Sequence, residues 1–199
     1  MQTFLPYKSF TKTARCLDTP RLSRQVGQVL HVLQCISEGE WRCSTCANRF
    51  RDEYAVSPCC KAKLEVAAWA HNPVTLMWTG YELALVRYGL ALCKELMTRA
   101  NRYRRGRHKV DVYTQALKER AKEFAPTTEG WHLPTWLGKK KLHSSHRAAL
   151  LRKDGLHYGQ FGWRETPLRK DHMGRYQYWW PIKVTPPKHR PNRQSRVQL

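Results

Sequence analysis

The chain has 199 residues, of which 41% are hydrophobic and 11% aromatic, so it can bury a core and is not an intrinsically disordered protein. Its 36 Lys and Arg residues outnumber its 15 Asp and Glu residues, which gives a formal net charge of +21 and a pI near 10.1. Because this excess is larger than solubility requires, we expect a polyanionic partner, with nucleic acid favoured over a membrane surface.

The chain begins with MQTFLPYKSF, which lacks the apolar core of a signal peptide and predicts a cytoplasmic protein. In that compartment the seven Cys residues are expected as thiols or metal ligands rather than as disulfides. No run of 18 apolar residues occurs, so the sequence predicts no membrane-spanning helix and no membrane partner.

The first elements are an extended segment and a helix. Residues 1–16 mix aromatic residues with Lys and Thr, which predicts extended chain. Asp18 or Thr19 can cap a following helix, whose apolar residues recur at helical spacing from Leu22 to Ile36. We expect this helix to end before Gly39.

Residues 39–66 lose the helical period and carry four cysteines, namely Cys43-x-x-Cys46 and the adjacent pair Cys59-Cys60. This spacing resembles a zinc ribbon, and a module of this size cannot build its own hydrophobic core without a metal. Four thiolates leave no open position for water, so the zinc would be structural. Two alternatives remain open: only one cysteine of the adjacent pair binds the metal, or His71 replaces one of them. Two unrelated pairs of buried thiols would give no metal site.

The stretch from Asn72 to about Arg99 has the clearest helical spacing of apolar residues in the chain. Its large apolar residues fall at steps of three and four and predict one long helix packed on the core: Met77, Tyr81, Leu85, Tyr88, Leu92 and Leu96. Asn72 can cap it and Pro73 suits its first turn. Glycines at positions 80 and 89 suggest the close approach of another backbone.

Two further helices are expected, over 110–124 and about 144–154, with Gly155 supplying a left-handed turn at the end of the second. Trp131 and Trp136 are expected to pack the loop between these helices onto the core. The predicted fold is therefore mainly α. It consists of a compact helical domain over 1–38 and 67–182, the inserted zinc ribbon over 39–66, and a disordered basic tail over 183–199.

Several blocks of the chain, taken together, resemble the bacterial and phage branch of the pyrimidine-dimer DNA glycosylase family, to which endonuclease V of the T-even phages belongs. The blocks are MQTFLPY, ARCLDTPRLSRQ, MWTGYELALVRYGLALC, LHSSHRAALLRKDGLHY and YQYWWP. The resemblance implies a compact all-helical fold that binds and kinks duplex DNA. It also implies DNA glycosylase and abasic-site (AP) lyase activity with no organic cofactor, acting in the cytoplasm of a bacterial or phage-infected cell.

The implied nucleophile is the α-amine of the chain, which we assign to Met1 because Gln2 is too large for efficient removal of the initiator methionine. The family also places a carboxylate eleven residues after the Leu of an L-D-x-x-[RG]-L motif. Counting from Leu17 puts Gln28 at this position, where an amide can neither ionise nor transfer a proton. Asp18 and Glu82 are the candidates to replace the missing acid.

The resemblance places DNA contacts on two helices, at Arg21, Arg24, His143, His146, Arg147, Arg152 and Lys153. For His143 and His146, hydrogen bonding to phosphate or to backbone is favoured over metal binding, because no carboxylate accompanies them. Arg152 and Lys153 can also form an ordinary solvated helix end. Two functions follow: a DNA repair enzyme of the glycosylase and lyase type, or a non-catalytic DNA- or RNA-binding protein that lost its acid.

Overall fold

The computed structural model describes residues 2–38, 41–46, 48–50, 56–66, 69–103, 106–125, 132–169 and 178–182. These residues form seven helices and three short strands, so the predicted mainly α fold is confirmed. The helices are α1 (Phe10–Cys16), α2 (Thr19–Glu38), α3 (Pro73–Trp78), α4 (Glu82–Tyr103), α5 (Arg107–Phe124), α6 (Lys140–Lys153) and α7 (Gly155–Gly159). The strands are β1 (Trp41–Cys43), β2 (Arg49–Phe50) and β3 (Leu64–Val66).

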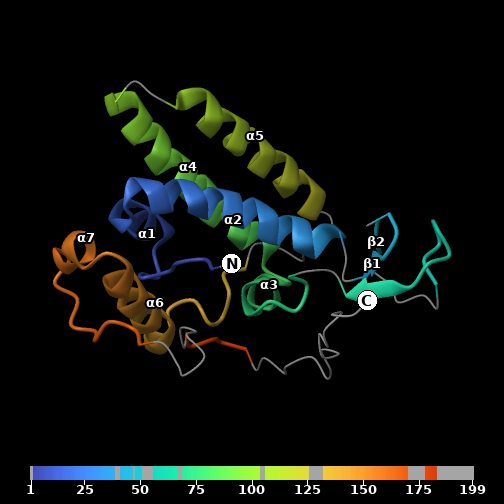
Figure 1. The fold of residues 1–199 in the computed structure, drawn as a ribbon. Helices are drawn as coiled ribbons and strands as arrows, with labels where there is room; N and C mark the ends of the chain where they lie inside the picture. Colours follow the sequence, from blue (N-terminus) through green and yellow to red (C-terminus); the bar gives the residue numbers. More distant parts are fainter. Residues whose placement is uncertain are drawn as a thin grey trace, which may run out of the picture.

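Helix α4 is the centre of the fold and packs against α1, α2 and α5 (Figure 1). Its residues Leu85, Tyr88 and Leu92 are fully buried, together with Leu33 of α2 and Leu117 of α5. Each such side chain stabilises the fold by about 1.5–3 kcal/mol before the entropy cost of ordering it. The predicted apolar face of this region is therefore the surface on which the other helices assemble.

The prediction of one continuous helix from Asn72 to Arg99 is wrong. The chain breaks after α3, where Gly80 adopts a left-handed conformation with φ of +81°, and α4 begins at Glu82. The Glu82 carboxylate accepts the Gly80 N–H at 2.7 Å, so this backbone N–H has a hydrogen-bond partner outside the helix. The predicted cap is confirmed, since the Asn72 side chain accepts the N–H of Val74.

Two other local predictions are wrong. Residues 10–16 form α1 rather than extended chain, and the Ser9 hydroxyl caps this helix by accepting the Lys12 N–H at 3.2 Å. Gly155 does not provide a left-handed turn, because it begins α7 with Asp154 as the cap. The predicted packing of Trp136 is confirmed, since it is buried and its indole N–H donates to the Met77 carbonyl at 3.1 Å.

The atoms that closely approach Gly89 belong to side chains rather than to the expected backbone, and nothing lies within 4 Å of a Cβ at Gly80. A Cβ at Gly89 would lie 2.9 Å from both Cδ atoms of Leu117 and 3.0 Å from Cγ1 of Val29. We expect Gly89→Ala to lower the free energy of unfolding by about 1–3 kcal/mol, although Ala favours a helix by about 1 kcal/mol over Gly. Gly27→Ala on α2 is the control, because nothing lies within 4 Å of its Cβ, and should stabilise by about 0.5–1 kcal/mol. Urea unfolding measures both, and a Gly89→Ala protein as stable as the wild type would contradict the packing.

The three strands form one antiparallel sheet in the order β2-β1-β3, with β1 in the centre. The sheet lies at the end of the molecule opposite α7 (Figure 1). No helix among the described residues is long and apolar enough to cross a membrane. The predicted tail over 183–199 and Trp131 lie outside the described residues.

Candidate active site

The N-terminal segment of the chain is buried in the protein. Gln2, Thr3, Phe4 and Leu5 are each less than a tenth exposed, and the segment lies between α2 and α6 (Figure 1). An extended buried segment must find partners for its backbone N–H and C=O groups outside a helix or sheet. Side chains from four helices supply partners for this segment.

Helices α2, α3 and α4 hold one side of it. Gln25 binds it twice, because its Oε1 accepts the Phe4 N–H at 2.7 Å and its Nε2 donates to the Gln2 carbonyl at 2.8 Å. The Tyr88 hydroxyl donates to the Phe4 carbonyl at 2.8 Å. Trp78 donates from its indole N–H to the Thr3 hydroxyl at 3.0 Å. These contacts fix the backbone of residues 2–4 on this side.

Helix α6 holds the other side through two histidines. His143 accepts the Gly138 N–H on Nε2, so its Nδ1–H donates to the Leu5 carbonyl at 2.7 Å. His146 accepts the Leu5 N–H on Nδ1 at 2.8 Å, and its Nε2 lies 2.9 Å from the side-chain amide nitrogen of Gln2. Both rings are buried, with His146 at 0% exposure. Both histidines therefore hydrogen-bond to the backbone of Leu5, which is one of the two roles expected for them, and their contact with DNA stays a prediction.

Burial, with a smaller contribution from the neighbouring His143, lowers the pKa of His146 to about 3. Because the unfolded chain takes up this proton near pH 6.5 and the folded chain does not, the stabilisation is complete above pH 6.5 and is lost as the pH falls towards 3. We expect urea unfolding at pH 5 to show a loss of about 2 kcal/mol from this group relative to pH 7. The free energy of unfolding of His146→Gln should fall correspondingly less between pH 7 and pH 5. The same loss in both proteins would contradict a neutral, buried His146.

A cavity of about 380 Å³ opens beside Gln2 at the start of the held segment. It is lined by Gln2, Phe4, Arg21, Arg24, Gln25, Gln28, Lys153 and Tyr178, and we refer to it as the Gln28 pocket. Gln28 lies against Gln25, whose Nε2 donates to the Gln28 Oε1 at 2.7 Å. Met1 itself lies outside the described residues.

The described lining of the Gln28 pocket contains three cationic side chains and three amides but no carboxylate. The candidate replacement acids are engaged elsewhere. Asp18 accepts the Tyr158 hydroxyl at 2.6 Å and pairs with Arg21 at 2.6 Å. Glu82 accepts the N–H of Gly80. Neither acid lines the pocket, so the described residues offer no substitute for the carboxylate that the family places at position 28.

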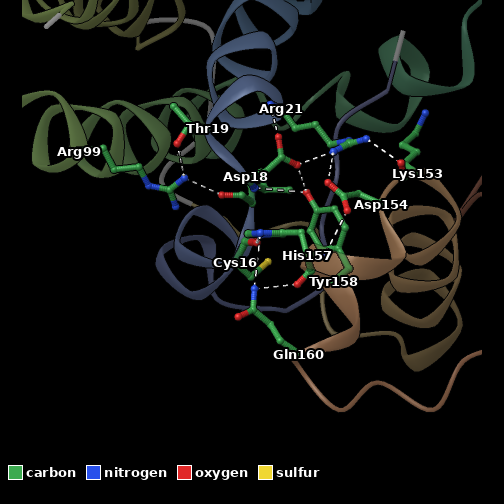
Figure 2. A network of polar contacts seen from close by, with 11 residues as sticks. Cys16, Asp18, Thr19, Arg21, Arg99, Lys153, Asp154, His157, Tyr158 and Gln160 are labelled. Atoms are coloured by element: carbon green, nitrogen blue, oxygen red, sulfur yellow. Dashed lines mark hydrogen bonds and ion pairs between the residues drawn. The ribbon is translucent and has the colours of Figure 1, made fainter. Parts of the chain in front are cut away.

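Two of the predicted DNA-binding arginines, Arg21 and Arg147, are bound to other residues of the protein. Arg21 is held by Asp18, by Asp154 at 3.7 Å and by the Lys153 carbonyl at 3.2 Å (Figure 2). Arg147 donates from Nε to Glu165 at 2.7 Å and from Nη1 to the Pro6 carbonyl at 3.0 Å. Both arginines are therefore held by partners within the fold, and only Arg21 lines the Gln28 pocket.

The other predicted DNA contacts have their side chains in water. Arg24 and Lys153 are exposed and line the Gln28 pocket, with the Lys153 ammonium 5.8 Å from the centre of the Phe4 ring. Arg152 is exposed and lines a separate hollow with residues 166–169. These three side chains are placed where a phosphate backbone could reach them.

The four cysteines of the insert come together. The Sγ atoms of Cys43, Cys46, Cys59 and Cys60 all lie within 4.8 Å of one another, and those of Cys46 and Cys59 are 3.3 Å apart. Zinc–sulfur bonds of about 2.3 Å place tetrahedral thiolates about 3.8 Å apart, so the donor set fits one metal ion and includes both members of the adjacent pair. His71 is not part of the cluster.

Sequence reasoning missed the residues that hold the N-terminal segment, above all Gln25, Trp78 and Tyr88. One signal was present, because Gln25 precedes Gln28 by three residues and therefore shares its face of the helix. The pairing of that face with residues 2–5 comes from tertiary structure, which a local pattern does not reveal.

A scan against protein families matches the pyrimidine dimer DNA glycosylase family over residues 1–109, more than half of the chain. The matched part contains the N-terminal segment, α2, Gln28, the cysteine insert and α4. Searches of curated proteins and of solved structures found no significant match. The chain belongs to the pyrimidine dimer DNA glycosylase family.

Proposed function

We propose that the protein binds damaged duplex DNA over the Gln28 pocket and acts on it as a DNA glycosylase and AP lyase through the α-amine of Met1. The observation that carries the proposal is the way in which four helices hold residues 2–5 so that Gln2 lines the pocket. These contacts hold the Gln2 side chain at the wall of a pocket that is lined by Arg21, Arg24 and Lys153.

An α-amine suits this chemistry because its ordinary pKa is near 8, so a useful fraction is neutral at pH 7, whereas a lysine near 10.4 is almost fully charged. The neutral amine attacks C1′ of the deoxyribose as the C1′–N bond breaks, and the departing base takes the proton that the attacking amine gives up. The C1′–O4′ bond then opens to form the protonated Schiff base, and O4′ takes a proton from water. Loss of a C2′ proton to water expels the 3′ phosphate by β-elimination. Arg24 and Lys153 would bind phosphates beside the pocket.

Gln28 limits this activity. Its amide can hydrogen-bond to the sugar but cannot accept a proton or balance the positive charge of the intermediate. Loss of a general acid or base typically costs about 10²- to 10⁴-fold in rate. We therefore expect weak turnover from the natural chain.

The second candidate function is DNA or RNA binding without cleavage. It is favoured by one observation, the lack of a carboxylate in the described lining of the pocket. In this case the fold and its basic surface still bind nucleic acid, but the protein no longer cleaves it.

Borohydride trapping separates the two functions, since it reduces a Schiff base to a stable covalent adduct. The natural protein would be incubated with duplexes that carry an abasic site or a cyclobutane dimer, with and without prior acetylation of its N-terminus. Slow trapping that acetylation abolishes supports the enzyme. Duplex binding without any trapping supports the binding protein, and failure to bind either duplex contradicts both the enzyme and a DNA-binding protein.

We also propose that the cysteine cluster holds one structural zinc ion. Four thiols lie within reach of a single tetrahedral ion, and the sheet around them has strands of only two or three residues. Such a sheet is too small to be stable alone, so the metal would supply its folding free energy.

A further inference from the structure

Helix α7 carries one side chain that the fold leaves in water. Leu156 is 96% exposed, the largest value among the exposed large hydrophobic residues that the structure describes. By contrast, Tyr158 on the same helix is fully buried. Single exposed leucines are common, so exposure alone assigns no role. A role for Leu156 is inferred from the residues that surround it.

Helix α7 is held rigidly by the polar network drawn in Figure 2. Tyr158 donates its hydroxyl to Asp18 at 2.6 Å, and a ring nitrogen of His157 lies 3.0 Å from the Cys16 carbonyl. Asp154 caps the helix by accepting the His157 N–H at 3.0 Å. Because residues on both sides of Leu156 are anchored to the start of α2, the leucine is presented on a stiff support.

The same network connects Leu156 to the Gln28 pocket. Arg21 and Lys153 line the pocket, and Arg21 also contacts Asp154, two residues before Leu156. Arg152 and Lys153 are exposed just ahead of it in the chain. Leu156 follows the pocket-lining Lys153 by three residues, so their Cα atoms lie within about 11 Å of each other. An exposed apolar side chain near a cationic pocket is complementary to duplex DNA, whose phosphates surround an apolar base stack.

We propose that Leu156 is a wedge that enters the base stack beside the nucleotide bound at the Gln28 pocket. Leucine is one of the side chains that proteins insert between base steps, and insertion unstacks the step and kinks the duplex by about 20–90°. Unstacking would open the duplex next to the pocket, where the sugar must be reached. This role rests on the proposed function, because it needs duplex DNA on the pocket face.

The test compares the natural protein with Leu156→Ala, Leu156→Met and Val112→Ala. Val112 is the control because it is an exposed apolar residue on α5 that does not line the pocket. The probe is a duplex with a tetrahydrofuran abasic analogue, which cannot form a Schiff base, and 2-aminopurine beside it, whose fluorescence rises when it unstacks. Affinity is measured on the same duplex, and thermal unfolding verifies that each variant folds.

We expect the natural protein, Leu156→Met and Val112→Ala to give a several-fold rise in fluorescence, and Leu156→Ala to give little or none while still binding. Equal unstacking by Leu156→Ala and the natural protein overturns the wedge and leaves the proposed function intact. Duplex binding by the natural protein without a rise in fluorescence also overturns the wedge and leaves the proposed function intact. A change in oligomeric state on Leu156→Ala, with unstacking unchanged, would assign the leucine to a protein contact instead. Absence of duplex binding by the natural protein contradicts the proposed function itself.

Discussion

Gln28→Glu is expected to raise AP lyase activity on abasic duplex DNA by a factor of about 10² or more. The substitution is nearly isosteric, so the packing of α2 should tolerate it. Placing a carboxylate in a partly buried site costs a few kcal/mol when it is unpaired, but Arg21, Arg24 and Lys153 line the same pocket and offset this cost. The rate of strand cleavage and the yield of borohydride-trapped adduct measure the gain.

Gln34→Glu is the matched control. It introduces the same charge on α2, six residues and about 9 Å along the helix from Gln28, and it does not line the pocket. We expect no gain from this variant. Equal activity in the natural protein and Gln28→Glu, at equal DNA affinity, would show that position 28 is not where the acid is needed.

Removal of the metal is expected to unfold the insert and leave the helical part folded. The purified protein should hold about one zinc ion per chain, and Cys43→Ser with Cys46→Ser should hold almost none. Structural zinc sites of this kind contribute about 10–16 kcal/mol of apparent binding free energy at pH 7, which a sheet of two- and three-residue strands cannot replace. Elemental analysis gives the zinc content, and hydrogen exchange over residues 41–66 reports the local unfolding.

Cys93→Ala is the control for the metal, because Cys93 is buried in the helical core and outside the cluster. It should keep a full equivalent of zinc. An unchanged zinc content in the double serine variant would remove the assignment of a four-cysteine site.

The helical part of the fold could be predicted from the spacing of apolar residues, because α2, α4 and α5 each place one face on the core. The break at Gly80 could not, since a helical pattern tolerates a glycine and does not reveal its φ. The short helix α1 was missed for a similar reason. Its seven residues span about two turns, too few for a period to show.

The candidate site was predictable in part. Motif spacing selected Gln28, which the structure places in a pocket beside Gln2. The same spacing could not reveal that His143 and His146 face inward, because their partner Leu5 is about 140 residues away in the chain. The spacing also could not reveal that Arg21 pairs with Asp154 and Arg147 with Glu165, because neither partner lies on the helix of its arginine.

The most direct test of the N-terminal amine as nucleophile is to locate the adduct that Gln28→Glu forms with abasic DNA under borohydride, by peptide mass spectrometry. We predict that the adduct lies on the α-amine of Met1. Lys153 lines the same pocket and carries the competing amine. An adduct on Lys153 or another lysine, or no adduct although the DNA is bound, would contradict the proposed mechanism.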